Sequence, residues 1–405
     1  MAKLAILGFG TVGSGVLQVL RQNQEVVRRR LGAPLEVKYI CDIRDFSESE
    51  DAALFVKDFE QVLSDPEVEL VVETIGGTNP AYNFVTRALE SGRHVVTSNK
   101  ELVATYGDVL LQKAKQHNVC FLFEASVGGG MPLITPMYQS MAANHLLAVQ
   151  GIVNGTTNYM LTCMEKEGLD FDTALQQAQS LGYAETIDPS SDVDGIDAGR
   201  KIAILAAIAF GKHVYPQNVP TRGIRAVTPA DIQAGQQMGR AVKLVAWAAK
   251  AAGGNLQCGV EPMLVSSSNL LAGVEDVFNA VAIQGDMLGE VLFYGKGAGK
   301  LPTASAVVAD AMDALQHGPA LHNNLFWLPA PPIEGQYQDT GRYNYYLRPT
   351  KPTNLQMVLQ QPNAKPIPGV AAAMLEAYSA EELASTVAAL AGQGVTTAIT
   401  MKLLD

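Results

Sequence analysis

The sequence predicts an α/β protein that begins with a doubly wound parallel sheet. Short apolar runs alternate with amphipathic stretches, the runs are apolar throughout, and a glycine-rich loop follows the first run. Such continuous apolar runs are typical of parallel strands that are buried on both faces. The predicted strands are Lys3–Leu7, Leu35–Cys41, Leu70–Thr74, His94–Thr97 and Val119–Phe123. The helices predicted between them are Val12–Arg30, Pro80–Ser91 and Tyr106–His117.

A second domain of α+β type is predicted over residues 132–340, after a first domain of residues 1–131. Its predicted helices are Phe171–Leu181, Asp197–Phe210, Ala230–Ala252 and Ala304–Leu315. Its predicted strand segments are Cys258–Val265 and Ala280–Phe293. We expect residues 303–340 to pack back on the first domain.

The last region, residues 341–405, has a different composition. Prolines cluster just before this region, at 329–332, and within it, at 349–352 and 362–368. Strands are predicted at Asn344–Leu347 and Thr396–Leu403, and a helix at Glu381–Ala391. These few elements predict a short, degenerate C-terminal segment.

The composition excludes several classes of protein. Hydrophobic residues make up 48% and charged residues 17% of the chain, which is too apolar for disorder. The net charge of −11 does not favour nucleic acid or anionic lipid as a partner. The apolar run Ile202–Phe210 is about half the length of a membrane span. No secretory signal and no CxxC spacing occur, so we expect a cytoplasmic protein with reduced cysteines and a small-molecule substrate.

The glycine-rich loop reads Gly8-Phe9-Gly10-Thr11-Val12-Gly13 and lies between a predicted strand and a predicted helix. Its first glycine permits a tight turn, its second allows a pyrophosphate to approach, and its third allows the helix and strand to pack closely. The free N–H groups at the helix N-terminus attract phosphate. The pattern predicts a Rossmann-type dinucleotide-binding domain.

The choice between NAD and NADP rests on the end of the second strand. An acidic residue there holds the ribose 2′-hydroxyl of NAD, whereas an arginine favours the 2′-phosphate of NADP. Both types are present, as Asp42 and Arg44, and either could also be an ordinary solvated loop charge. The sequence therefore leaves both cofactors open.

A carboxylate-rich loop runs from Gly182 into a strongly apolar helix. Asp197 and Lys201 are four residues apart, so a helix places them on one face. A surface ion pair is the simpler interpretation. However, the helix that follows is apolar on nearly every side and should be buried, which would place the lysine in an enclosed site suited to acid–base chemistry.

This loop and five other motifs follow the glycine-rich loop in a fixed order. They are Glu73–Gly77, Ser98–Leu102, Phe123–Pro132, Gly151–Tyr159, Gly182–Lys201 and Tyr294–Thr303. Together with the glycine-rich loop, they resemble the homoserine dehydrogenase family over roughly residues 1–345. The resemblance implies NAD(P)-dependent interconversion of L-aspartate 4-semialdehyde and L-homoserine, in threonine, methionine and isoleucine biosynthesis. It also implies that the second domain is catalytic and forms a homodimer or homotetramer.

The resemblance assigns roles to matching residues. Lys201 would be the general acid, Asp197 would orient it together with the substrate, and Lys100 would lie beside the nicotinamide and substrate. The implied substrate-binding residues are Glu185, Asp197, Gly182 and Tyr183. The implied cofactor-binding residues are Gly8, Phe9, Gly10, Thr11, Val12, Gly13, Arg44, Thr74, Ser98, Lys100, Gly297 and Gly299. A sodium or potassium site would consist of Glu124 and the backbone carbonyls of Val127, Gly129 and Met131.

Two features depart from the family pattern. The loop between Glu185 and Asp197 is one residue longer, at Thr186-Ile187, which puts the placement of Glu185 in doubt. Residues 341–405 resemble a shortened regulatory domain of the ACT type without a recognisable ligand loop. We therefore expect weak or absent feedback by threonine.

Two other functions were considered. One is a Rossmann-fold dehydrogenase for a different amino-acid semialdehyde or amino acid, and the other is a nucleotide sensor without activity. The retention of Lys201, Asp197 and Glu185 disfavours both, because this set suits an amino-bearing substrate whose carbonyl group is protonated.

Overall fold

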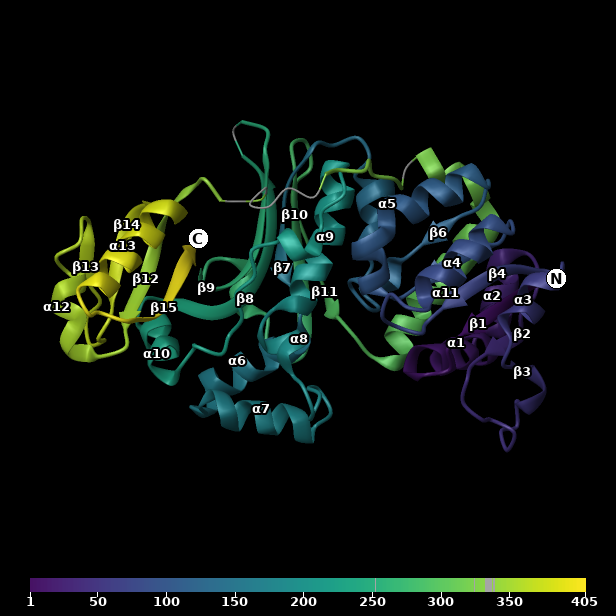
Figure 1. Ribbon diagram of the computed structural model, residues 1–405, viewed down its shortest axis with the longest axis horizontal. Coiled ribbons are helices and arrows are strands. Elements are labelled where there is room, and N and C mark those ends of the chain that lie inside the picture. Colours follow the sequence, from purple (N-terminus) through teal and green to yellow (C-terminus); the bar gives the residue numbers. More distant parts are fainter. Residues whose placement is uncertain (252, 324, 332–336, 338) are drawn as a thin grey trace. The chain divides into compact units, whose positions relative to one another are not determined.

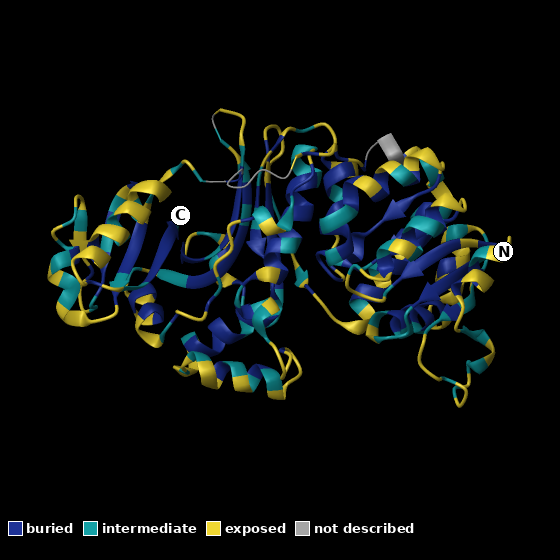
Figure 2. Ribbon diagram, in the orientation of Figure 1, coloured by how far each residue is buried: buried dark blue, intermediate teal, exposed yellow. Residues whose placement is uncertain are grey.

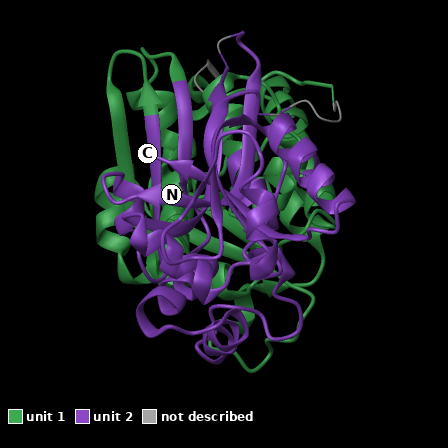
Figure 3. Ribbon diagram, turned by 90° about the vertical axis from the view of Figure 1, so that its left-hand side faces the viewer, with its two compact units in different colours: residues 1–146, 203–216, 284–332 green, residues 147–202, 217–283, 333–405 purple. Residues whose placement is uncertain are grey.

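The computed structural model describes the chain except for residues 252, 324, 332–336 and 338. It forms two compact units (Figure 3). The first unit comprises residues 1–146, 203–216 and 284–332, and the second comprises residues 147–202, 217–283 and 333–405. Both units are assembled from separate stretches of the chain. The contiguous domain limits 131 and 340 remain a prediction.

The first unit contains the predicted parallel sheet, which is confirmed (Figure 1). Its order is β3-β2-β1-β4-β5-β6, and all its neighbours run parallel. The strands are β1 (Ala2–Leu7), β2 (Leu35–Cys41), β3 (Phe55–Val56), β4 (Val68–Glu73), β5 (His94–Thr97) and β6 (Phe121–Leu122). The order reverses between β1 and β4, where doubly wound sheets bind ligands beyond the carboxyl ends of the strands.

Helices flank this sheet, whose strands are mostly buried (Figure 2). They are α1 (Thr11–Gln22), α2 (Gln24–Leu31), α3 (Phe59–Ser64), α4 (Ala81–Glu90), α5 (Lys100–Gln116) and α11 (Lys300–His317). The predicted helix Val12–Arg30 is two helices, divided at Asn23. Helices α1 and α11 pack closely at Gly15, because a Cβ atom there would lie 2.9 Å from the carbonyl oxygen of Lys300. The strand β11 (Gly289–Lys296) also belongs to this unit.

The second unit contains a mixed sheet whose strands follow the order β10-β7-β8-β9-β15-β12-β14-β13. The first four are β7 (Leu146–Ile152), β8 (Arg240–Lys250), β9 (Leu256–Ser266) and β10 (Phe278–Gly285). The helices are α6 (Gly155–Glu167), α7 (Phe171–Ser180), α8 (Ser190–Val193), α9 (Ile196–Phe210), of which residues 203–210 belong to the first unit, and α10 (Pro229–Gln237).

The predicted helix Ala230–Ala252 is wrong over its second half. Helix α10 ends at Gln237, and Gly239 adopts a left-handed φ of +66° before β8 begins. An apolar run of this kind has no decisive periodicity. Its state is set by antiparallel pairing with β9, which extends from Arg240–Ser266 to Lys250–Leu256.

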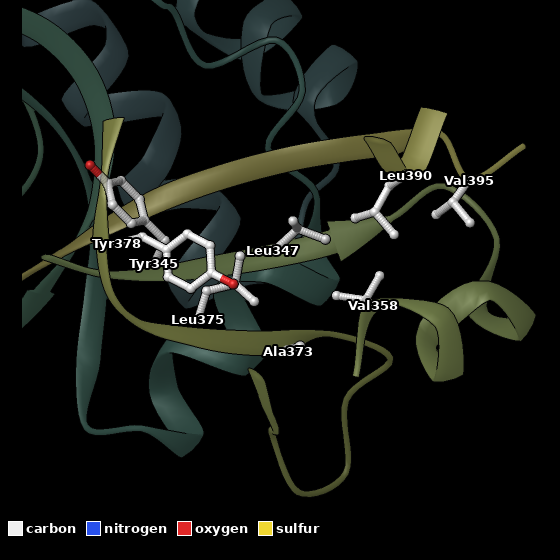
Figure 4. Packing of buried hydrophobic residues seen from close by; sticks show 8 residues of the cluster. All are labelled: Tyr345, Leu347, Val358, Ala373, Leu375, Tyr378, Leu390 and Val395. Atoms are coloured by element: carbon white, nitrogen blue, oxygen red, sulfur yellow. The ribbon is translucent and has the colours of Figure 1, made fainter. Parts of the chain in front are cut away.

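The C-terminal segment forms a β-α-β-β-α-β arrangement with its own core (Figure 4). Its elements are β12 (Arg342–Pro349), α12 (Leu355–Val358), β13 (Ala364–Pro366), β14 (Ala373–Ser379), α13 (Ala380–Gly392) and β15 (Thr397–Leu404). The core residues are Tyr345, Leu347, Val358, Ala373, Leu375, Tyr378, Leu390 and Val395. The sequence prediction missed β13, β14 and α12. The first helix is only one turn long, and β15 joins the segment to β9 by parallel pairing.

Candidate active site

The glycine-rich loop lies at the carboxyl end of β1, at the point where the strand order reverses. Gly8 has a φ of +87°, and a Cβ atom on Gly13 would lie 2.1 Å from the carbonyl oxygen of Gly8. Helix α1 begins at Thr11 without a side-chain cap on Gly10. Its first N–H groups are therefore suited to holding a phosphate.

Asp42 and Arg44 form a tight pair at the end of β2. Oδ1 of Asp42 accepts hydrogen bonds from the backbone N–H (2.9 Å) and the Nε (3.0 Å) of Arg44. Oδ2 accepts from Nη2 of Arg44 and from the N–H of Phe9, both at 2.7 Å. These bonds to the Arg44 guanidinium hold the pKa of Asp42 well below its usual range. The four donors occupy the four lone-pair sites of the carboxylate.

Other predicted cofactor residues surround the same edge of the first unit. The Thr74 hydroxyl donates to the carbonyl oxygen of Gly8 at 2.7 Å. Ser98 follows β5, and Lys100 is the first residue of α5, which is capped by Asn99. Thr74, Ser98 and Lys100 thus follow the carboxyl ends of β4 and β5.

Gly297 and Gly299 lie close to the loop that carries the predicted cation ligands. A Cβ atom on Gly129 would lie 2.7 Å from the backbone carbon of Gly297. Gly299 has a φ of +125° and precedes the first residue of α11. The tight packing at Gly129 and the left-handed conformation at Gly299 both favour glycine.

The predicted catalytic pair is buried in the second unit, at the start of α9. The Nζ of Lys201 lies 2.9 Å from Oδ2 of Asp197 and donates to the carbonyl oxygen of Val153 at 2.7 Å. Asp197 is 4% exposed and Lys201 7% exposed. An ammonium group has three donors. Among the described residues, these two partners account for two of them, which leaves one N–H for a substrate oxygen.

Asn154 and Asp192 complete this cluster, and the sequence prediction assigned neither. The Nδ2 of Asn154 donates to Oδ1 of Asp192 at 2.7 Å and to Oδ2 of Asp197 at 3.0 Å. Its Oδ1 accepts from the N–H (2.9 Å) and the hydroxyl (2.8 Å) of Thr157, so the amide orientation is determined. Burial raises the pKa of Asp192, and the charge of Asp197 adds to the effect. Both residues lie within motifs of the family pattern, but nothing in the sequence indicates that they meet.

The predicted substrate-binding loop is more exposed. Glu185 and Tyr183 are exposed, and Ile187, in the lengthened part, is 95% exposed. The loop is anchored where the Thr156 hydroxyl donates to the carbonyl oxygen of Tyr183 at 2.7 Å. Gly182 turns the chain here with a φ of +75°. Glu185 therefore belongs to the same unit as Asp197 but is not enclosed with it.

Glu124 is buried, and its carboxylate faces backbone N–H groups. Oε1 accepts from Leu133 at 2.6 Å and from Ile134 at 2.9 Å, and Oε2 accepts from Thr135 at 2.7 Å. With about four lone-pair sites on a carboxylate, one site on Oε2 remains. A cavity of about 380 Å³ borders Glu124 and Asp310, and burial together with the Glu124 charge raises the pKa of Asp310.

The other predicted cation ligands are backbone oxygens. Among the described residues, no hydrogen bond ends on the carbonyl oxygen of Val127, Gly129 or Met131. Oxygen donors of this kind suit a hard cation. In the described part of the chain, no group of three or more His, Cys, Asp and Glu side chains is placed to hold a metal. Nor does any described helix have the length and apolar character to cross a membrane.

Comparison with known protein families gives a consistent result. Residues 8–124 match the family model described as homoserine dehydrogenase, NAD binding domain, and residues 132–312 match that described as homoserine dehydrogenase. Homoserine dehydrogenase from Synechocystis sp. is 44% identical over 77% of this chain and 72% of its own length. The chain belongs to the homoserine dehydrogenase family. The Neisseria gonorrhoeae homoserine dehydrogenase is 42% identical over 76% of this chain and 71% of its own length.

Solved structures of homoserine dehydrogenases extend the similarity to the whole chain. The Thiobacillus denitrificans enzyme is 33% identical with a TM-score of 0.88, covering 100% of this chain and 98% of that one. The Staphylococcus aureus homoserine dehydrogenase at pH 7.0 is 30% identical with a TM-score of 0.78, covering 100% and 99%. A hyperthermophilic archaeal homoserine dehydrogenase in complex with NADPH is 30% identical with a TM-score of 0.65, covering 77% and 97%.

These findings confirm the predicted activity. The protein is an NAD(P)-dependent oxidoreductase that interconverts L-aspartate 4-semialdehyde and L-homoserine. The alternative of a different Rossmann-fold dehydrogenase is not favoured. The roles of individual residues in homoserine dehydrogenase chemistry remain predictions.

Proposed function

We propose that Lys201 donates the proton to the carbonyl oxygen of aspartate semialdehyde and removes it again from homoserine. The observation that supports this role is the third N–H of its ammonium group, which neither Asp197 nor Val153 uses. The bound nicotinamide supplies or accepts the hydride. As the carbonyl carbon gains the hydride, its oxygen takes up a proton from Nζ, and Lys201 becomes a neutral amine.

Asp197 and Asn154 would position this lysine. The Asp197 carboxylate holds the ammonium group in one orientation, and Asn154 holds the carboxylate. Asp192 adds a second negative group beside the pair, which would favour a positively charged substrate group. Glu185, Gly182 and Tyr183 would provide the remaining contacts to the substrate ammonium after their exposed loop moves toward it.

The cofactor would bind along the carboxyl edge of the parallel sheet. Residues Gly8 to Gly13 would hold the pyrophosphate at the N-terminus of α1, and Gly297 and Gly299 would close over the cofactor. Thr74, Ser98 and Lys100 would line its nicotinamide end. The residues around the adenine ribose would distinguish NADP from NAD.

We infer a preference for NADP over NAD from the Asp42–Arg44 pair. The lone pairs of Asp42 are occupied by Arg44 and Phe9, so a ribose 2′-hydroxyl finds no acceptor there unless Arg44 moves. The side chain of Arg44 is 56% exposed, and the N–H groups of its guanidinium that do not bind Asp42 would donate to a 2′-phosphate. Arginine is well suited to phosphate because its donors form a planar fork.

A sodium or potassium ion would bind to Glu124 and to the carbonyl oxygens of Val127, Gly129 and Met131. The unused lone pair of Glu124 and the three carbonyl groups support this assignment. The ion would fix a loop that packs against Gly297, so its contribution would be to the structure of the cofactor site. It takes no part in proton transfer in this proposal.

Family membership supports a proposal for the cellular setting. The enzyme would act in the cytoplasm, in threonine, methionine and isoleucine biosynthesis, as a homodimer or homotetramer. Light scattering during gel filtration tests the oligomer. We also expect weak or absent threonine feedback, because the first helix of the C-terminal segment is one turn long. Calorimetric titration with threonine tests this, and tight binding in the cavity of about 760 Å³ bordered by Trp247, Tyr345 and α13 would contradict it.

The decisive test is oxidation of homoserine with NADP or NAD, followed by the absorbance of the reduced cofactor. We expect activity in the wild type and a loss of several orders of magnitude in Lys201→Ala. A matched control is Lys243→Met, because Lys243 is also buried in the second unit and donates to the carbonyl oxygen of Val274. Equal losses in both variants would show a structural effect and remove the support for Lys201 as the proton donor.

A further inference from the structure

Glu73 is a fully buried carboxylate at the carboxyl end of β4, and no role has been assigned to it above. It is 0% exposed and immediately precedes the loop of residues 74–77. Burial raises the pKa of Glu73, which measures the cost of enclosing this charge. A buried carboxylate persists in a fold only where donors compensate for the lost water.

Three donors compensate Glu73. Oε1 accepts from the N–H of Ile75 at 2.6 Å and, more weakly, from that of Gly76 at 3.4 Å. Oε2 accepts from the hydroxyl of Thr97 at 2.6 Å. The Thr97 hydroxyl donates to Glu73 while its oxygen accepts from the N–H of Asn99 at 2.9 Å. Each of these three partners of Glu73 is a donor.

Asn99 links Thr97 back to the loop of residues 74–77. The Nδ2 of Asn99 donates to the carbonyl oxygen of Gly77 at 2.6 Å, at the far end of the loop that Glu73 holds. The Oδ1 of Asn99 accepts from the N–H of Leu102 at 3.1 Å and caps α5. One buried acid therefore joins the loop after β4 to the helix whose first residue is Lys100.

The position of this network in the sheet indicates which part of the cofactor it serves. The pyrophosphate would lie at α1, after β1, and the adenine ribose would lie near Asp42, after β2. Since β2 and β4 flank β1 on opposite sides, the nicotinamide end falls over β4 and β5. Glu73 and Thr97 are the last residues of those two strands.

We propose that Glu73 is a positioning residue for hydride transfer: with Thr97 and Asn99 it holds the loop 74–77 and Lys100 against the nicotinamide end of the cofactor. It contacts neither cofactor nor substrate in this proposal. The inference rests on the cofactor orientation proposed above. Its consequence is a separation of effects, because the adenine half of the cofactor would bind at β1, β2 and α1, and the partners of the Glu73 carboxylate are Ile75, Gly76 and Thr97, outside those elements.

The test compares Glu73→Gln and Thr97→Val with the conservative variant Thr97→Ser. Glu73→Gln keeps the shape of the side chain but turns an acceptor into a donor, and Thr97→Val removes only the bridging hydroxyl. We expect kcat to fall about tenfold to a hundredfold in these two variants, as for small misplacements of reacting groups. We expect Thr97→Ser to retain most of the activity.

Two readouts distinguish positioning from a general loss of structure. One is the primary deuterium isotope effect with homoserine deuterated at C4, which should rise as hydride transfer becomes rate-limiting. The other is the Kd of the cofactor's adenine half, ADP-ribose or its 2′-phosphate, which should stay within about twofold while that of the whole cofactor weakens. Fragment binding lost in parallel with whole-cofactor binding would overturn the proposal, as would an unchanged isotope effect and kcat in folded variants.

Asp231→Asn provides the matched control. Asp231 is also 0% exposed, but it lies in the second unit, where it is bonded to Arg348 and Tyr346. Its replacement should lower the melting temperature without changing the isotope effect. If the wild type binds the adenine fragment tightly but does not oxidise homoserine, the assigned reaction fails. The effect of Glu73→Gln on the Kd of the whole cofactor, relative to that of the fragment, then still tests the role of Glu73.

Discussion

Oδ2 of Asp197 lies 2.9 Å from the Nζ of Lys201 and 3.0 Å from the Nδ2 of Asn154. One carboxylate oxygen thus serves both the lysine and the amide that also reaches Asp192. Asn154 thus joins two acids, one of which also pairs with the lysine. Its energetic consequences can be measured residue by residue.

Replacing Asp197 by asparagine should cost both stability and activity. The variant would leave the buried Lys201 ammonium without its charged partner, at a cost of about 3 to 5 kcal/mol. Urea unfolding followed by tryptophan fluorescence measures the loss, since Trp247 reports on the second unit. We expect kcat to fall with it. A variant as stable as the wild type would show that the ion pair is not needed to hold the lysine.

Replacing Asp192 by asparagine should change the pH dependence of stability. Burial raises the pKa of Asp192, so the folded state holds this proton more tightly than the unfolded chain. The contribution of Asp192 to stability is therefore full at low pH and is lost as the pH rises through the raised pKa. The asparagine at position 192 of the variant does not titrate, and its carboxamide oxygen can still accept a hydrogen bond from Asn154. Its stability relative to wild type should increase from about pH 4 to pH 8.

Unfolding curves at a series of pH values test this sign. If the difference in the free energy of unfolding between Asp192→Asn and wild type stays constant with pH, the predicted pH dependence is contradicted. Homoserine oxidation by the same variant should be weaker, because a negative group beside the proposed substrate ammonium is lost. A gain in stability with a loss of activity would separate the two effects.

Replacing Arg44 by alanine should change the choice of cofactor. Loss of a charged hydrogen bond to the 2′-phosphate costs about 1.5 to 3 kcal/mol, or roughly tenfold to a hundredfold in KM for NADP. The KM for NAD should stay the same or fall, because the oxygens of Asp42 become available to the ribose. Steady-state kinetics with both cofactors measure this. Equal effects on NAD and NADP would place Arg44 outside the ribose site.

Replacing Glu124 by glutamine tests the cation site. The variant keeps one acceptor oxygen but removes the charge that faces Leu133, Ile134 and Thr135. We expect the wild type to be stabilised by sodium or potassium chloride beyond the effect of tetramethylammonium chloride at equal ionic strength. The variant should lose that difference. Equal responses to all three salts in the wild type would argue against a bound ion.

Several parts of the fold follow from local sequence patterns. The strands β1, β2 and β5 are continuous apolar runs, and the glycine-rich loop marks the turn into α1. Features of this kind are local, because a run of a few residues determines them. The division of the predicted first helix at Asn23 is a finer detail that this pattern did not reveal.

Other parts depend on contacts between distant residues. Residues 240–250 are a strand because β9 pairs with them, although their apolar pattern also fits a helix. The strands β13 and β14 hold only as part of the sheet that shares the core with Leu390 and Val395. The propensity of a short segment is too weak to oppose such pairing.

The sequence by itself determined the cofactor loop and the Asp197–Lys201 pair, because each depends on neighbours within a few residues. It also indicated the family through the order of its motifs, and the parallel sheet through the alternation of apolar runs with amphipathic stretches. The tertiary structure decided that Asn154 joins Asp192 to Asp197, and that Glu73 joins two loops through Thr97. These partners are 24 to 43 residues apart in the chain. Hydrogen bonds require their atoms to lie within about 3 Å. Only the packing of strands and helices brings such distant residues to that separation, and it also sets which charges are buried.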